Sequence, residues 1–370
     1  MEQVRDLGER GCRTAWLRPA GRPEVREIMM GSPEGQKGRL NLDAISRLSA
    51  MADFAFAFAI RAVGAIGVAD HLKDGPLDIA TLAARTDCNE DALLRVMRAL
   101  ASKSVFSEGP SGTFTLEPMG DLLRTDHPLS MRWFFRTDPD AQAMAGLEYS
   151  IRTGQPAFDH LFGMDYFDWL AAHPEPLERF RQSQSALNRL EFLAITRSYP
   201  WREIRTIVDI GGNDGSLLKA LLQKNPELSG TVFDLPGTAE KAHSVFEPAG
   251  ISDRTTVVSG NIFEGNVPPG ADLYIMKRIL VGFSDEQTVL ALSNVRRAMA
   301  PHSRLLIMEP TPDGADQVGL SLDLLMVVLG LGRVRSREQF ESLLNSAGLA
   351  FQRRINAGLL TIIESRIARD

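Results

Sequence analysis

The chain has 370 residues, 44 % hydrophobic and 24 % charged, a globular composition with enough material for two domains. Its formal net charge of −6 provides no basic footprint for phosphates, which argues against nucleic acid as the main partner. The two cysteines, Cys12 and Cys88, exclude a disulfide framework or a multi-cysteine zinc site. We therefore expect no metal centre and a reducing, cytoplasmic location.

The first 38 residues are rich in Gly, Arg, Glu and Pro and lack the apolar core of a secretion signal. We predict a disordered tail over 1–38; a start at Met29 or Met30 is the alternative. No uncharged apolar run approaches the length of a membrane helix, since the longest, 54–68, is interrupted by Arg61. This run is too apolar to face water throughout, so we expect it to lie in a contact between two copies of the chain.

Residues 39–195 form the first predicted domain, in which apolar residues recur at three- and four-residue spacing as in helices. Asp78 and Asn89 are suited to cap two helices, at 79–85 and 90–102. The order helix, turn, helix is typical of a winged helix.

Two short extended pieces, 105–106 and 113–116, flank a Gly-Pro-Ser-Gly turn and complete the winged-helix pattern. Modules of this kind often read DNA. Here, however, the second helix opens with Glu90 and Asp91, whose charges would repel phosphates. We predict that this domain does not bind nucleic acid.

Residues 196–370 form the second predicted domain, in which strands alternate with helices as in a doubly wound parallel sheet. A final hairpin, 351–356 and 359–364 around Ala357-Gly358, makes the last strand antiparallel to the others. The five preceding strands are predicted at 206–210, 231–235, 255–259, 272–277 and 304–309.

The sharpest motif is Asp-Ile-Gly-Gly-Asn-Asp-Gly, which begins at Asp209 at the end of the first of these strands. Gly211, Gly212 and Gly215 permit a tight turn and a close approach of a ligand to the backbone. Asn213 replaces the second glycine of the dinucleotide fingerprint, and no Lys-Ser or Lys-Thr pair follows. Both differences weigh against a nicotinamide or a nucleoside triphosphate.

Two further segments strengthen the ligand prediction at this sheet edge. Asp234, 25 residues after Asp209, closes the second strand in Phe-Asp-Leu-Pro with Leu235, and its carboxylate is suited to both hydroxyls of a ribose. Asn261 and Ile262 follow the third strand, where an amide and an apolar side chain suit an adenine. An ordinary strand-to-loop turn explains Asn261 and Ile262 equally well.

The order of these motifs, with Tyr-Ile-Met-Lys and Leu-Ile-Met-Glu-Pro further on, resembles class I S-adenosylmethionine-dependent methyltransferases. It is most similar to the small-molecule O-methyltransferases of plant phenylpropanoid and bacterial polyketide or anthracycline pathways. The resemblance runs from Leu40 to Arg366 and includes Arg-Thr-Gly-Gln-Pro-Ala at 152–157 and His-Leu-Phe-Gly at 160–163.

The resemblance implies a Rossmann-like doubly wound α/β sheet with an antiparallel last strand, preceded by an all-helical winged-helix dimerisation domain. It implies S-adenosylmethionine as the cofactor, with Lys277 near the adenosine. It also implies a homodimer in which the helical half of one subunit helps to wall the substrate pocket of the other.

The departures from the family concern its catalytic residues. In O-methylating members the fourth strand is followed by Lys-x-x-x-His-Asp-Trp, whose His is the general base. Here Val281 stands at the His and Gly282 at its acidic neighbour, and Val334 falls on the family's second acid. Glu309 matches the other supporting acid but has no His to orient. Since valine cannot accept a proton, this chain should not deprotonate a phenol in the family's usual way.

Three activities remain open. Methyl transfer to nitrogen or carbon needs no strong base, and we prefer it. Methyl transfer to oxygen would need a different base or a substrate that is already ionised. In the third activity the cofactor is bound without use of its methyl group, for hydroxylation, dehydration or ring formation.

Candidate substrate contacts lie in the helical half. His160 is a possible replacement base, although a surface or core histidine is the default interpretation. Gln184 and Asn188 lie at helical spacing and are suited to a polar substrate group. Aromatic side chains close together in the sequence could stack on a planar substrate, although most should be core: Phe158, Phe162, Tyr166 and Trp169.

Overall fold

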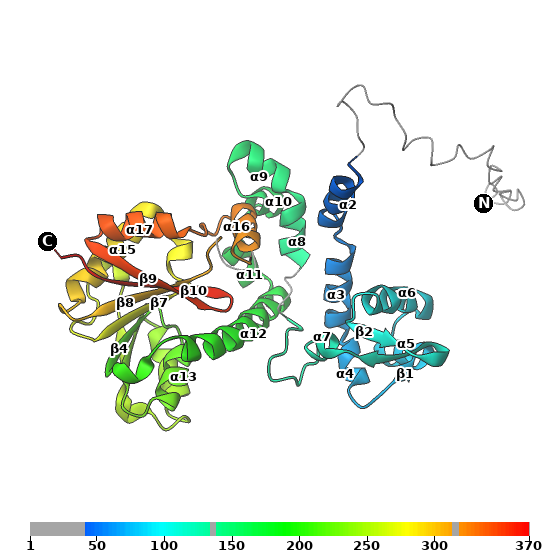
Figure 1. Cartoon of the computed structure of the whole chain (residues 1–370), viewed down its shortest axis with the longest axis horizontal. Coiled ribbons are helices and arrows are strands. Elements are labelled where there is room, and N and C mark those ends of the chain that lie inside the picture. Colours follow the sequence, from blue (N-terminus) through cyan, green and yellow to red (C-terminus); the bar gives the residue numbers. More distant parts are fainter. Residues whose placement is uncertain (1–40, 134–137, 313–317, 370) are drawn as a thin grey trace, which may run out of the picture. The chain divides into compact units, whose positions relative to one another are not determined.

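The computed structural model describes residues 41–133, 138–312 and 318–369 (Figure 1). It divides into two units, Met1–Phe54 and Ala55–Asp370. The described part of the first unit is helix α2 (Leu42–Met51), whose N-cap Asn41 accepts a hydrogen bond from the Ala44 amide at 3.0 Å. The tail predicted over 1–38 lies outside the described residues.

The second unit begins with the predicted winged helix, and both predicted capping residues are confirmed. Asp78 Oδ1 accepts from the Thr81 amide at 2.8 Å, and Asn89 Oδ1 accepts from the Ala92 amide at 3.0 Å. These caps satisfy amide groups that the first helical turn leaves without partners. The helices are α3 (Ala55–Ile66), α4 (Val68–Leu72), α5 (Ile79–Thr86) and α6 (Glu90–Ala101).

The prediction of an all-helical domain was wrong, because this part carries a three-stranded antiparallel sheet in the order β1-β3-β2. The hairpin β2 (Phe106–Glu108) and β3 (Thr113–Leu116) was expected, with the 3₁₀ turn η1 (Pro110–Gly112) between its strands. The missed strand β1 (Leu77–Asp78) has two residues, too few for a pattern, and pairs with β3.

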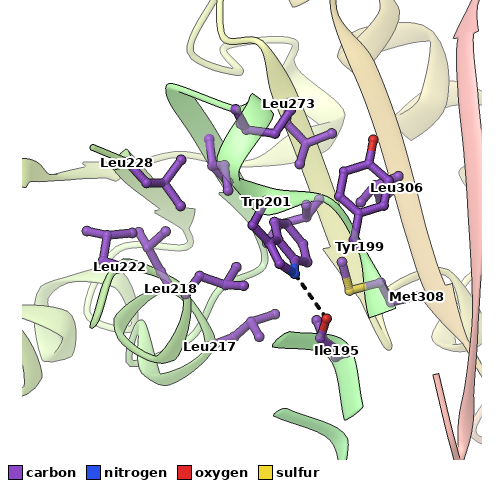
Figure 2. Close-up of a cluster of buried hydrophobic side chains, with 14 of the residues drawn as sticks. Ile195, Tyr199, Trp201, Leu217, Leu218, Leu222, Leu228, Leu273, Leu306 and Met308 are labelled. Carbon is purple, nitrogen blue, oxygen red and sulfur yellow. Dashed lines mark hydrogen bonds between the residues drawn. The ribbon is translucent and has the colours of Figure 1, made fainter. Parts of the chain in front are cut away.

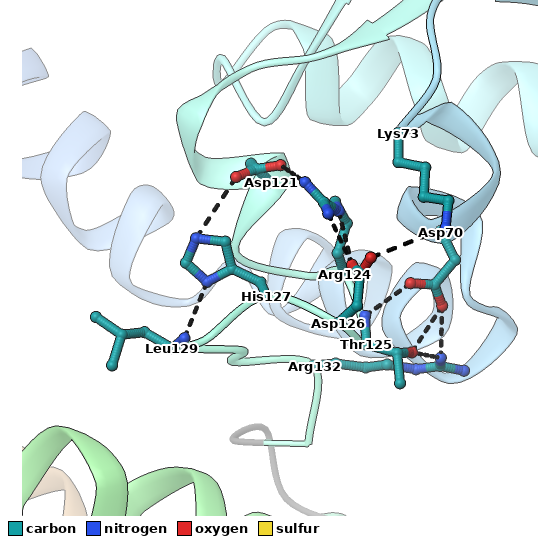
Figure 3. A network of polar contacts seen from close by, with 9 residues as sticks. All are labelled: Asp70, Lys73, Asp121, Arg124, Thr125, Asp126, His127, Leu129 and Arg132. Atoms are coloured by element: carbon teal, nitrogen blue, oxygen red, sulfur yellow. Dashed lines mark hydrogen bonds and ion pairs between the residues drawn. The ribbon is translucent and has the colours of Figure 1, made fainter.

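A polar network follows the wing and helix α7 (Pro118–Asp121) (Figure 3). Asp70 on α4 accepts from the Thr125 amide at 2.6 Å and pairs with Arg132 at 2.8 Å. Arg124 pairs with Asp121 at 2.7 Å and with Asp126 at 2.8 Å. These contacts tie the segment after α7 back to α4.

One stretch of the described residues, Leu42–Ile66, is long and apolar enough to cross a membrane by length and composition alone. It consists of α2, a break at 52–54, and α3. The sequence prediction considered only uninterrupted runs and did not identify it.

Five helices lead from the winged helix to the sheet domain. The last of them, α12, is 25 residues long and runs across the domain boundary predicted at residue 195. The five are α8 (Asp138–Ala145), α9 (Leu147–Thr153), α10 (Ala157–Phe162), α11 (Tyr166–Ala172) and α12 (Pro174–Ser198).

The sheet has seven strands in the order β6-β5-β4-β7-β8-β10-β9. The first five are parallel, and β10 pairs antiparallel with both β8 and β9, as predicted for the last strand. The strands are β4 (Thr206–Ile210), β5 (Ser229–Asp234), β6 (Thr255–Ser259), β7 (Leu273–Lys277), β8 (Arg304–Glu309), β9 (Leu349–Ala357) and β10 (Leu360–Ile367). The Rossmann-like fold class is confirmed.

Helices cover both faces of this sheet (Figure 1). They are α13 (Ser216–Lys224), α14 (His243–Phe246), α15 (Asp285–Ala298) and α17 (Arg337–Ser346). Short 3₁₀ turns connect them: η2 (Trp201–Glu203), η3 (Ala239–Ala242), η4 (Ser252–Arg254), η5 (Ile262–Glu264) and η6 (Leu280–Gly282). Helix α16 (Val318–Leu329) packs against α8, α9 and α10.

Neighbouring strand residues enter different cores because side chains alternate across a sheet. In β4, Ile207 joins the cluster under α13, whereas Val208 joins the cluster under α15 and α17. In the first cluster Trp201 is almost completely buried, and its Nε1 donates to the Ile195 carbonyl at 3.1 Å (Figure 2). Trp201 thus joins the end of α12 to the sheet.

Trp201→Phe should lower the free energy of unfolding by about 1–3 kcal/mol, because it leaves a small cavity and an unpaired buried carbonyl. Denaturant unfolding measures this change. Leu290→Ala, at an exposed position of α15, is the control and should change stability by less than about 0.5 kcal/mol. Equal stability of Trp201→Phe and the wild type would contradict the proposed role of Trp201.

Candidate functional site

A glycine turn follows β4 at the carboxyl edge of the sheet, as predicted. Gly211 has φ 68° and Gly215 has φ 73°, values that L side chains rarely adopt. A Cβ atom at Gly211 would lie closer than 3.0 Å to Ile279, and one at Gly215 would lie as close to Phe246. The turn therefore requires glycine at both positions, and it opens α13.

Asp209 lies beneath this turn and is 2 % exposed. Its Oδ2 has no hydrogen-bond partner among the described residues. The pKa of Asp209 is raised to about 7. Burial is the main cause, Lys277 opposes the shift, and Asp234 adds to it. A Cβ at Gly212 would lie 2.8 Å from the Asp209 carboxyl group. The turn thus lies directly over a carboxyl group with an unused acceptor atom.

Asp234 ends the neighbouring strand β5, and its carboxylate faces the glycine turn. Its Oδ2 accepts from the Asn213 amide at 2.8 Å, and its Oδ1 accepts from the Leu235 amide at 2.7 Å. Each carboxylate oxygen has a second lone pair, so both retain acceptor capacity for a ligand diol. Leu235 is half exposed beside it.

Asn261 and Ile262 lie at the end of β6. Asn261 Oδ1 caps η5 by accepting from the Phe263 amide at 3.0 Å, which leaves the side-chain NH₂ group as a donor. Ile262 is partly buried against the core under α15. Since β6 is parallel to β4 and β5, Asn261 and Ile262 lie at the same edge of the sheet as Asp209 and Asp234.

Lys277 ends β7 and is held by α12. Its Nζ donates to Asn188 Oδ1 at 2.9 Å and pairs with Glu191 Oε2 at 3.0 Å. Asn188, which we predict to contact substrate, accepts this hydrogen bond from Lys277. The sequence prediction missed Glu191, which is completely buried and also pairs with Arg278 at 2.6 Å.

Val281 lies in η6, immediately after β7, and Glu309 at the end of β8 supports this turn. Glu309 Oε1 accepts from the Leu280 amide at 2.8 Å and the Val281 amide at 3.2 Å. Its Oε2 has no partner among the described residues, and burial raises the pKa of Glu309 to about 7 against the opposing effect of Arg278. Glu309 thus accepts hydrogen bonds from the backbone of the turn that carries the histidine base in O-methylating members of the family.

Arg335 holds the same loop from the other side. It is 1 % exposed and donates to the Leu280 carbonyl at 2.6 Å and the Phe283 carbonyl at 2.5 Å. Val334, at the family's second acid, is also buried. The hydrogen bonds to Glu309 and from Arg335 therefore fix the position of η6. Neither Val281 nor Val334 can titrate, so the turn carries no side-chain base.

The aromatic candidates and His160 form a cluster of their own. Phe158 and Tyr166 are completely buried, while Phe162 and Trp169 pack partly buried around them. His160 is exposed and stacks on Tyr149, with ring centroids 4.0 Å apart. Within the described residues, the four aromatic candidates belong to a core cluster, and His160 lies exposed beside Tyr149.

A cavity of about 640 Å³ lies in the second unit. Gln184, a predicted substrate contact, lines it, and so does Arg278, which the sequence analysis did not single out because nothing in the local pattern indicates it. The lining comprises Ala57, Ile60, Arg61, Asp140, Ala141, Met144, Ser183, Gln184, Leu187, Arg278, Ser321, Leu322 and Leu325. Its size suits a drug-sized ligand, and most of its wall is apolar.

Residues 145–350 match the O-methyltransferase domain, and residues 48–126 match the O-methyltransferase dimerisation domain. The chain belongs to the O-methyltransferase family. It is 36 % identical over 306 residues to a phenazine O-methyltransferase of Lysobacter antibioticus, covering 81 % of this chain and 89 % of the relative.

Two other relatives of the family carry different activities in their names. An 8-amino-8-demethylriboflavin N,N-dimethyltransferase of Streptomyces davaonensis is 35 % identical, with 80 % of this chain and 87 % of the relative covered. An aclacinomycin 10-hydroxylase of Streptomyces purpurascens is 33 % identical, with 82 % and 84 % covered.

The crystal structure of a calicheamicin-biosynthesis methyltransferase in its S-adenosylhomocysteine-bound form superimposes with a TM-score of 0.81. It is 30 % identical and covers 90 % of this chain and 100 % of that chain. The enzyme is therefore an S-adenosylmethionine-dependent methyltransferase that acts on small secondary metabolites. The unused Oδ2 of Asp209, and the glycines of the turn above it, which place no side chain between the backbone and a ligand, fit this cofactor.

The pKa of Glu309 predicts a pH dependence of stability. Its ordinary value is 4.5, so a folded-state value of about 7 favours folding at low pH, and this contribution is lost as the pH rises through about 7. The difference corresponds to roughly 3 kcal/mol at most. In Glu309→Gln, the free energy of unfolding should fall less between pH 5 and pH 8 than in the wild type.

Urea unfolding at several pH values measures this difference. Glu227→Gln, at an exposed glutamate paired with Arg205 on the surface, is the control and should follow the wild-type curve. A Glu309→Gln curve parallel to the wild type would show that Glu309 does not titrate in this range.

Proposed function

We propose that this methyltransferase transfers its methyl group to a nitrogen or carbon atom of a substrate bound in the cavity lined by α8, α12 and α16. The observation that carries the proposal is Val281, which stands where the resemblance places a histidine base. The backbone amides of Leu280 and Val281 are occupied by Glu309. A nucleophile that must lose a proton before attack would therefore find no side-chain base at this turn.

Loss of a general base typically lowers a rate 10²- to 10⁴-fold. An amine or aromatic nitrogen attacks with its lone pair, and an electron-rich ring or enol carbon attacks with its π electrons. For these nucleophiles, catalysis consists mainly of alignment with the methyl group. A firmly held turn and a shaped cavity supply alignment.

Of the two atoms, nitrogen has the support of a relative, because the riboflavin-type enzyme is named as an N,N-dimethyltransferase. Oxygen is the second candidate. It is favoured by the phenazine O-methyltransferase and by the unpartnered Oε2 of Glu309, whose raised pKa suits proton acceptance near neutral pH. The hydroxylase relative keeps a third possibility open, in which the methyl group is not used.

We assign the cofactor to the carboxyl ends of β4, β5, β6 and β7. The cofactor supplies a methyl group activated by its positive sulfur. The turn from Gly211 to Gly215 would approach it with backbone amides, Asp234 would accept from its ribose, and Asn261 and Ile262 would contact its adenine. Lys277 Nζ already donates to Asn188 and Glu191, so Lys277 would support the cofactor site without contacting the cofactor directly.

We also propose that the enzyme is a homodimer. The matched dimerisation domain begins at residue 48, and apolar side chains of α2 and α3 are at least half exposed: Leu42, Ile45, Leu48, Met51 and Phe58. A second copy would remove them from water.

Asp234→Ala should weaken binding of S-adenosylmethionine by about 10- to 100-fold, because a charged acceptor of two hydrogen bonds is lost. Isothermal calorimetry with S-adenosylhomocysteine gives the same comparison without turnover. Asp253→Ala, an exposed aspartate at the opposite edge of the sheet, is the control and should bind normally. Unchanged affinity in Asp234→Ala would remove the ribose assignment.

Restoring the family's residues tests the nucleophile. In the double variant Val281→His with Gly282→Asp, the second substitution has room, because a Cβ at Gly282 would meet nothing within 4 Å. If the acceptor is nitrogen or carbon, the variant should not methylate the native substrate faster than the wild type. It should instead gain weak O-methylation of catechol-like compounds. An increase of about tenfold or more on the native substrate, within the range of a restored base, would identify oxygen as the acceptor.

Mass spectrometry after incubation with extract of the producing organism's own pathway identifies the reaction. One added methyl group with matching demethylated cofactor is the expected result, and fragmentation places the methyl group on nitrogen, carbon or oxygen. A product formed while the cofactor stays intact would replace methyl transfer by chemistry of the hydroxylase type.

A further inference from the structure

Arg278 combines three properties that the proposed methyl transfer does not explain. It lines the 640 Å³ cavity, it is the first residue after β7, and its backbone has φ 54°. Its amide still donates to the Met308 carbonyl at 3.0 Å, so the left-handed conformation is built into the edge of the sheet. A residue other than glycine in this conformation is strained, and such strain often marks a functional position.

The charge around Arg278 is not balanced by its partner. Glu191 is completely buried, and its single carboxylate faces both Lys277, at 3.0 Å, and Arg278, at 2.6 Å. Two cations and one anion leave this group of three residues with one positive charge, and the nearby buried acids Glu309 and Asp209, whose pKa values are raised to about 7, offset that charge only where they ionise. Burial strengthens the field of this excess charge at the cavity wall.

Arg278 also retains unused hydrogen-bond donors. Its Nε donates to Glu191 Oε1 at 2.7 Å, and its Nη2 lies beside the same oxygen. Its Nη1 donates no hydrogen bond to any residue in the described ranges. The Arg278 side chain as a whole is 17 % exposed and lines the cavity, so this donor remains open to a ligand there.

The rest of the cavity wall offers no better anion site. Arg61 and Asp140 also line it, and both already interact with other residues. Met144, Leu187 and Leu325 contribute apolar surface, while Gln184 adds a neutral amide. Arg278 is therefore a cation with spare donors on a largely apolar wall.

We propose that the substrate is a largely apolar ring compound with an anionic oxygen group, a carboxylate, that pairs with Arg278. This inference rests on the proposed function, because it places the substrate in the same cavity. Guanidinium matches the two oxygens of a carboxylate with parallel donors, which a lysine cannot do. Anchoring the carboxylate at the end of β7 fixes the orientation of the ring, and Arg278 thereby determines which ring position faces the cofactor site.

Binding of two matched probes tests the inference. Calorimetry on the full chain saturated with S-adenosylhomocysteine compares 1-naphthoate with naphthalene-1-carboxamide, which has nearly the same shape without the charge. The wild type should prefer the carboxylate. Arg278→Gln should lose this preference, with about thirtyfold or more weaker binding of 1-naphthoate and little change for the carboxamide.

Matched variants separate this role from general effects. Arg181→Gln removes one positive charge from an exposed position of α12 and should behave as the wild type. In Arg278→Gln, Glu191 keeps Lys277 as its partner, and normal cofactor binding verifies that the variant is folded. The inference is overturned if the wild type shows no preference, if Arg278→Gln retains it, or if Arg61→Gln alone abolishes it.

The natural acceptor gives an independent test. Pathway extract is separated on an anion exchanger at pH 8, and each fraction is assayed for uptake of labelled methyl groups. Acceptor activity in the retained, acidic fractions supports the inference, and Arg278→Gln should then raise KM more than it lowers kcat. Acceptor activity confined to the unretained fractions overturns it. If no fraction accepts methyl groups, the proposed function fails, and the probe measurements still decide the role of Arg278.

Discussion

The buried carboxylate of Glu191 is the interaction on which the site depends. It joins α12, which lines the 640 Å³ cavity, to Lys277 and Arg278 at the carboxyl end of β7, the edge to which we assign the cofactor. Leaving a buried charge without its partner typically costs about 3–5 kcal/mol, so this pairing holds the helix against the sheet edge. Glu191 thus sets the distance between the cavity and the sheet edge, although our proposals place it in contact with neither the substrate nor the cofactor.

A second constraint comes from two buried acids near this cluster. The pKa values of Asp209 and Glu309 are both raised to about 7 by burial, and Lys277 opposes both shifts. Each acid also has one oxygen without a partner among the described residues. The scaffold therefore keeps its proton-accepting groups beneath the backbone, under the glycine turn and under η6, while the surface of η6 carries valine.

Strands and motifs could be predicted because their signals are local. Three of the strands, β4, β6 and β8, have the predicted bounds, and Asp78 and Asn89 cap helices as expected. Strand β1 escaped prediction because its two residues acquire strand geometry only by pairing with β3. Glu191 escaped because its partners are 86 and 87 residues away, and in sequence it is one more acid on a polar helix. The predicted roles of the cofactor and substrate residues remain predictions.

The aromatic candidates show why composition alone could not locate the substrate. Phe158 and Tyr166 have the chemistry of a stacking platform, but the shortest way to remove them from water is to pack on α16, which they do. The cavity is lined by residues from α3, α8, α12, α16 and the end of β7, which no continuous segment reveals. Replacing the family's histidine by Val281 leaves all of these elements in place. Under the proposed function, the substitution changes which nucleophile can react and leaves the cavity intact, so one cavity architecture would serve several acceptor atoms.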